Sequence, residues 1–136
     1  MARLVRILHS ALLGGMALSG AVLYLVRRMP QAPPTLEIPR LGLVFAVVPV
    51  LLLVVAVTAL RPRVPERPTG QDTDAYWNEL RSRGASLVLW ATIEGAGLVG
   101  AVGYFLTGAT APAVAFGLAL AALVLFRPGR LEGETS

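Results

Sequence analysis

The chain of 136 residues contains no cysteine, no lysine and a single histidine. The absence of cysteine excludes disulfides, thiolate metal sites, iron–sulfur clusters and thioether-attached haem. The absence of lysine excludes a P-loop lysine and a Schiff-base nucleophile. One histidine cannot form an intrachain bis-histidine haem site, and an active metal site usually takes three or more protein ligands. We therefore expect no enzymatic activity, no cofactor and no bound metal.

Charged residues are also scarce. They make up 15% of the chain, against about a quarter in a typical soluble domain, while hydrophobic residues make up 55%. All twelve basic residues are arginines, and they flank apolar stretches. Membrane topology therefore explains the net charge of +4 better than nucleic-acid binding does. The arginine-only, Ala/Val/Gly/Leu-rich usage is typical of a GC-rich bacterial genome, so we expect a bacterial inner-membrane protein.

Four apolar stretches are predicted to be transmembrane helices: residues 4–26, 41–60, 86–106 and 111–126. A span needs about 20 apolar residues to cross a hydrocarbon core of about 30 Å. A signal peptide is the competing interpretation of the first stretch, but its apolar run is longer than a signal-peptide core and a second span follows soon after it. The predicted fold is thus an all-α integral membrane protein, a single domain with four transmembrane helices arranged as two tandem helical hairpins.

The polar connections predict the topology. Residues 72–84 read as an interfacial amphipathic helix, with a partner-docking helix as the alternative. Nine arginines lie at the termini and in the loop between spans two and three, and three lie on the opposite side, so both termini are predicted to be cytoplasmic. The predicted membrane-interface anchors are Tyr76, Trp77, Arg27, Arg28, Arg61 and Arg127.

A shift of 80 positions overlays the first span on the third. Seven identities fall within residues 11–25, and the shared pattern is Gly-x-x-Leu-x-Gly-Ala-Val-x-Tyr. Apolar composition raises the number of chance matches between membrane helices. The pattern nevertheless favours a tandem repeat whose halves are related by an axis along the membrane normal.

The third span carries a stripe at steps of four and three residues, which is the spacing of a helix-packing seam. Its members are Trp90, Glu94, Gly97, Ala101 and Tyr104, and the overlay matches them to Ser10, Gly14, Ala17, Ala21 and Tyr24. We therefore expect spans one and three to pack at the centre, with Trp90 and Glu94 filling the room left by Ser10 and Gly14. On this hypothesis Gly14→Leu disrupts folding.

Two residues are candidates for proton or cation handling. Glu94 is the one acid inside a predicted span, where a carboxylate costs a few kcal/mol. It either handles ions or is a structural glutamate bonded to a hydroxyl, to the Trp90 indole or to a partner subunit. His9 lies about 8 Å inside the first span at helical rise. It is either an interfacial, hydrogen-bonded histidine or, given its similar depth, a partner of Glu94.

The run Ala-x-x-Glu-Gly-Ala-Gly that begins at Ala91 loosely resembles the proteolipid c subunits of rotary ATPases. These combine a membrane-embedded carboxylate with glycine-rich helices, and the resemblance implies an ion-handling role for Glu94. In that family, however, the two features normally lie on different helices, whereas here both are on the third span. The whole chain is similar to small uncharacterised four-span bacterial membrane proteins, and that resemblance implies no function.

We expect a non-enzymatic structural or accessory subunit of a larger bacterial membrane complex. The alternative is a small proton- or cation-handling transporter or channel-like oligomer that uses Glu94. A third option is a protein that contacts lipid or pigment through a groove lined by Trp90 and Tyr104. The expected partners are the lipid bilayer and other membrane subunits or a second copy of the chain, and not nucleic acid.

Overall fold

The computed structural model describes residues 1–133, and every regular element among them is a helix. The order is α1 (Ala2–Arg28), α2 (Leu41–Val55), α3 (Thr73–Asn78), α4 (Leu80–Thr107), α5 (Thr110–Leu125) and α6 (Pro128–Leu131). A π-helical turn, Ala56–Leu60, and a 3-10 turn, Arg61–Arg63, continue α2. The all-helical prediction is confirmed.

Three helical segments are long and apolar enough to cross a membrane: Ala2–Arg28, Leu41–Arg63 and Leu80–Thr107. The fourth apolar helix, α5, has 16 residues and is shorter. The helix expected over residues 72–84 is divided. Glu79 has an extended backbone (φ −67°, ψ 125°), so α3 ends before it and the residues after it belong to α4.

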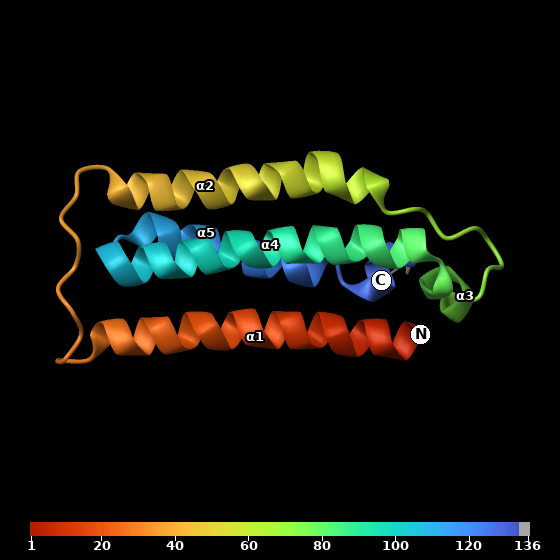
Figure 1. Cartoon of the computed structure of the whole chain (residues 1–136), viewed down its shortest axis with the longest axis horizontal. Helices are drawn as coiled ribbons and strands as arrows, with labels where there is room; N and C mark the ends of the chain where they lie inside the picture. The colour runs from red at the N-terminus through yellow and green to blue at the C-terminus, as the bar shows by residue number, and fades with distance from the viewer. Residues whose placement is uncertain (134–136) are drawn as a thin grey trace.

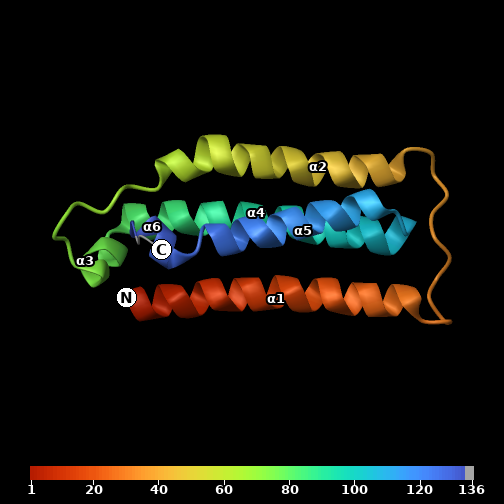
Figure 2. The same ribbon diagram turned by 180° about the vertical axis from the view of Figure 1, so that it is seen from behind.

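The central element of the fold is α4. It packs against α1, α2 and α5, and it forms a tight antiparallel hairpin with α5 through Gly108, whose φ of 67° favours glycine. The helices α1 and α2 lie on opposite sides of this hairpin (Figure 1), and the reverse view agrees (Figure 2). Among residues 1–133, α1 and α2 do not pack against each other.

The arrangement corrects the prediction of two tandem hairpins, because the first pair of helices does not form one. The connection between them, residues 29–40, runs across the end of the α4–α5 hairpin, where the Leu36 N–H donates to the Leu106 carbonyl at 2.8 Å. Extended chain covers about 3.3 Å per residue, so twelve residues easily reach across two helix spacings of about 8–10 Å each. A long, proline-rich connection therefore allows α1 and α2 to lie on opposite sides.

Three glycines of α4 each meet a different helix. A β-carbon on Gly97 would collide with Met16 of α1, one on Gly100 with the backbone of α5 and one on Gly103 with Phe45 of α2. Steps of three residues turn the facing direction by about 60° in a helix with 3.6 residues per turn. These glycines therefore point in three neighbouring directions, and close approach on each side makes α4 the centre of the bundle.

The predicted seam between spans one and three is wrong at three of its α1 positions. Ser10, Gly14 and Ala17 are exposed, and a β-carbon on Gly14 would meet nothing within 4 Å. The residues of α1 that are buried there are His9 and Met16.

The physical reason is that α1 packs on α4 one residue out of the register that the repeat overlay predicts. Met16 of α1 packs on Gly97 of α4, and His9 packs on Trp90, so the contacting pairs differ by 81 positions rather than 80. One residue turns a helix face by about 100°. Of the α4 members of the seam, Trp90, Gly97 and Ala101 are buried. At the far end Tyr24 and Tyr104 stack with ring centroids 6.0 Å apart.

Candidate functional site

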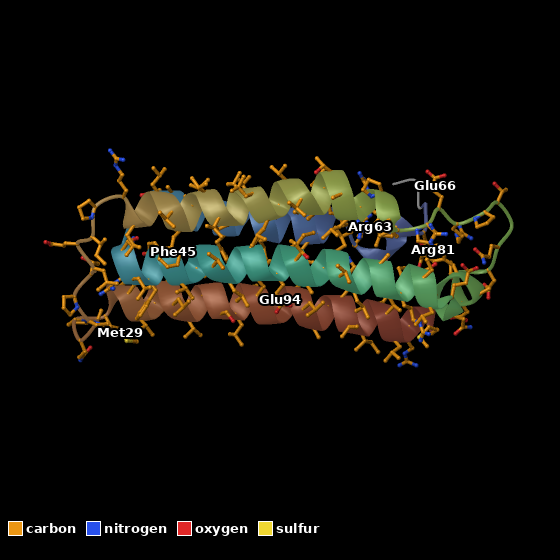
Figure 3. The ribbon with its side chains drawn as sticks, turned by 45° about the horizontal axis from the view of Figure 1, so that its top comes forward. Met29, Phe45, Arg63, Glu66, Arg81 and Glu94 are labelled. Atoms are coloured by element: carbon orange, nitrogen blue, oxygen red, sulfur yellow. The ribbon has the colours of Figure 1, made fainter. Side chains whose placement is uncertain are left out.

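Glu94 lies midway along α4 and is half-buried. Figure 3 shows it near the middle of the bundle, remote from the polar connections at both ends. Within residues 1–133 no side chain or backbone group forms a hydrogen bond or an ion pair with its carboxyl group. The carboxyl group is therefore without a bonding partner in the single chain.

The possible His9–Glu94 pair is not formed. His9 is 5% exposed, and its Nε2–H donates to the Leu123 carbonyl of α5 at 2.8 Å. The Trp90 indole packs edge-on against His9 at 5.0 Å, and its N–H donates to the Phe126 carbonyl at 2.8 Å. The last carbonyls of a helix have no partner within that helix. His9 and Trp90 therefore cap the end of α5, and neither is a partner for Glu94.

A buried polar cluster lies at the end of the bundle where α1 begins. Glu132 is at its centre. The Glu132 side chain is 6% exposed. Its two oxygens accept hydrogen bonds from Nη2 of Arg6 at 2.9 and 2.7 Å, and Oε1 also accepts one from the Trp77 indole at 2.5 Å. The Glu132 backbone oxygen accepts a bond from Nε of Arg67 at 2.9 Å. This glutamate thus connects α1, α3 and the segment after α2 to the segment after α5.

The aromatic pair of α3 belongs to the same cluster. Tyr76 and Trp77 are 1% and 0% exposed, which corrects their prediction as side chains that face the lipid headgroups. The Tyr76 hydroxyl donates to the Pro65 carbonyl at 2.7 Å, and burial raises the pKa of this hydroxyl above its ordinary value. The two rings meet edge-on at 4.8 Å, and Trp77 lies 6.2 Å from Trp90. The polar atoms of both side chains form hydrogen bonds inside the protein, so the pair is part of the core.

The four predicted arginine anchors differ in their surroundings. Arg27 donates to the Phe105 carbonyl near the end of α4 at 2.5 Å and to the Pro33 carbonyl, so it neutralises the negative end of that helix. Arg28 lies over the Tyr24 ring at 4.7 Å. Arg61 is half-exposed and Arg127 is exposed.

At the end where α1 begins, an exposed carboxylate holds α1 to α3. Asp74 accepts a hydrogen bond from the Ala2 N–H at 2.9 Å and lies 3.3 Å from the amino group of Met1. These two contacts lower the pKa of the Asp74 carboxyl below its ordinary value.

The sequence pattern identified Glu94 but not Glu132. Its partners lie 55, 65 and 126 positions away, and an acid in a short charged tail gives no sign of burial. The apolar Leu131 beside it, 3% exposed, is the one local signal that this tail folds back. Between residues 1 and 133 no three His, Cys, Asp or Glu side chains lie together as metal ligands.

The regular elements of residues 1–133 are all helices, and three helical segments have the length and apolar character found in all-helical membrane proteins. No protein-family model, curated protein or solved structure matches the chain. Its function is therefore inferred from its own residues.

Proposed function

We propose that the chain is a non-enzymatic structural subunit of a larger assembly in a bacterial inner membrane. In this proposal α5 is the fourth span and both termini are cytoplasmic. The arginine distribution supports the orientation. Nine arginines lie near the termini, in the connection after α2 and in the first turn of α4, which gather at one end of the bundle, and three lie at the other end. Cytoplasmic segments carry such an excess of arginine and lysine.

The observation that carries this proposal is the unbonded carboxyl group of Glu94. A polar group without a hydrogen bond costs free energy in hydrocarbon, where no water replaces the missing partner. Nothing among residues 1–133 satisfies Glu94. A donor on a neighbouring subunit would satisfy it, and intramembrane acids usually pair with such groups.

The outer surface of α1 also favours a protein neighbour. Gly14 and Gly15 point into open space, where a β-carbon would meet no atom within 4 Å. Small residues let two helix backbones approach closely in lipid, where no hydrophobic effect drives helices together. The exposed face of α1 is therefore suited to contact with another transmembrane helix.

The test is extraction of the tagged chain from its native membrane in mild detergent, followed by native electrophoresis and mass spectrometry of the bands. We expect co-migration with other membrane subunits at a fixed stoichiometry, and loss of that band in Glu94→Leu. Glu66→Leu is the control, because Glu66 is exposed in the polar connection (Figure 3). Migration as a single chain, or an unchanged band in Glu94→Leu, would contradict the proposal.

The second candidate is an ion-handling oligomer. It is favoured by the partial exposure of Glu94, because a carboxyl group at the edge of the bundle can be reached by protons or cations. The separating experiment compares wild type with Glu94→Gln in proteoliposomes that contain a pH-sensitive dye. A structural subunit leaves proton flux at the level of empty vesicles in both. Flux that is present in wild type and absent in Glu94→Gln would instead establish the ion-handling function.

A further inference from the structure

We propose that a groove between α1, α3 and α4 binds one anionic phospholipid, with an acyl chain in the groove and the phosphate on Arg83. The groove has a volume of about 180 Å³. Apart from Met1 and Arg83, its lining consists of Leu4, Val5, Leu8, Trp77, Leu87 and Trp90.

The lining suits a hydrocarbon chain. An apolar cavity of about 150 Å³ is large enough to hold a benzene molecule, so this groove can accept several methylene groups. Leu4, Leu8 and Leu87 are 59%, 39% and 40% exposed, so the groove is open on its outer side. The indole N–H groups of Trp77 and Trp90 are used by Glu132 and by the Phe126 carbonyl. The tryptophans are buried and form the inner wall of the groove with ring carbons and not with polar atoms.

Arg83 supplies the charge at the mouth of the groove. Its Nε is buried and has no hydrogen-bond partner in the described part of the chain, and its Nη1 contacts only the Met1 sulfur, at 3.8 Å. No carboxylate of residues 1–133 forms an ion pair with it. A guanidinium group binds phosphate oxygens through two parallel N–H bonds. The donors on the Nη atoms of Arg83 are therefore complementary to a lipid phosphate.

The position of Arg83 along α4 is suited to contact with a lipid headgroup. The apolar run predicted from residue 86 begins three positions after Arg83, which is about 4.5 Å along a helix. The groove lining includes no carboxylate that could bind a choline or ethanolamine cation, and the nearby Asp74 carboxylate is already paired with the Met1 amino group and the Ala2 N–H. An anionic headgroup therefore fits better than a zwitterionic one. The choice of an anionic lipid also rests on the orientation proposed above, which puts this end of the bundle at the cytoplasmic leaflet, where anionic lipids are abundant.

The protein carries its own probe for this site. Trp77 and Trp90 are the two tryptophans of the chain, and both line the groove. Bromine atoms on an acyl chain quench indole fluorescence at short range. The full chain is reconstituted into vesicles of phosphatidylcholine and phosphatidylglycerol in which one lipid or the other is brominated, at equal mole fractions. One arginine near the surface gives about fivefold enrichment of an anionic lipid, so we expect brominated phosphatidylglycerol to quench more strongly.

The variant that tests the phosphate contact is Arg83→Gln, which is expected to remove the difference between the two brominated lipids. Arg81→Gln is the matched control. Arg81, labelled in Figure 3, is exposed and lies outside the groove lining. Two residues turn a helix face by about 200°, so Arg81 points away from the side of Arg83. It is expected to keep the difference. Leu8→Phe keeps Arg83 but narrows the open side of the groove, and it is expected to weaken quenching by brominated phosphatidylglycerol.

Four outcomes would overturn the proposal. The first is equal quenching by the two lipids in wild type. The second is an unchanged preference in Arg83→Gln, and the third is an equal loss in Arg81→Gln, which would reveal general surface charge. Quenching that falls as the protein-to-lipid ratio rises would also overturn it, because a second copy of the chain would then fill the groove. Circular dichroism checks that each variant is folded. If Arg83→Gln does not fold, Leu8→Phe still tests the proposal.

Discussion

Gly100→Ala is expected to destabilise the chain by about 3 kcal/mol, at the upper end of typical overpacking costs. A β-carbon at this position would lie 2.8 Å from the Pro112 carbonyl oxygen and 2.9 Å from the Phe116 backbone nitrogen. Both are backbone atoms of α5 and cannot rotate away, so α4 and α5 must separate along their contact. The measurement is thermal unfolding in detergent, followed by circular dichroism and by tryptophan fluorescence.

Gly95→Ala is the control for this prediction, since it makes the same chemical change on the same helix. A β-carbon on Gly95 would meet no atom within 4 Å. Alanine also favours a helix over glycine by about 1 kcal/mol, so this variant should be as stable as wild type or slightly more stable. Equal losses of stability in Gly95→Ala and Gly100→Ala would show that helix packing at Gly100 is not the cause.

The helices themselves could be predicted because each has a recognisable local sequence pattern. An apolar run with arginine or proline at its ends is sufficient to place the ends of α1, α2 and α4 within six residues. The division at Glu79 was missed, because one extended residue between two helical segments leaves little trace in the sequence.

The neighbours of each helix could not be predicted in the same way. In lipid every apolar helix face is equally well solvated, so close steric fit decides which helices pack together. The stripe on the third span was recognised as a packing surface. Its partner residues were misassigned because the repeat overlay aligns Gly97 with Ala17, whereas Met16 makes the contact. A shift of one residue is invisible to a comparison of composition.

The candidate site residues also differ in whether local sequence is enough to identify them. Glu94 could be identified from its sequence position alone, because an acid in an apolar run is conspicuous in any register. Arg83 and Glu132 could not, because their importance depends on what surrounds them. Arg83 has a buried Nε without a hydrogen-bond partner in the described part of the chain, and Glu132 accepts hydrogen bonds from three distant segments.

Glu132→Ala is expected to destabilise the chain by about 3 kcal/mol, the lower end of the range for breaking a buried ion pair. The substitution leaves the Trp77 indole N–H buried without an acceptor and removes both bonds from Arg6. The Arg6 side chain is 48% exposed and can regain water, which limits the loss. The midpoint of thermal unfolding in detergent measures the effect, and a blue or red shift of tryptophan emission reports the change at Trp77.

The control for Glu132→Ala is Glu66→Ala, which removes an acid from the same polar end of the bundle. Glu66 is exposed, and within residues 1–133 no side chain pairs with it, so its loss should change stability by less than about 0.5 kcal/mol. Adding Arg6→Ala completes a double-mutant cycle. If Glu132 acts through Arg6, the double variant loses less stability than the two single variants lose together. Strict additivity would instead assign the stabilisation to Trp77, and an unchanged midpoint in Glu132→Ala would show that the cluster does not hold this end of the bundle together.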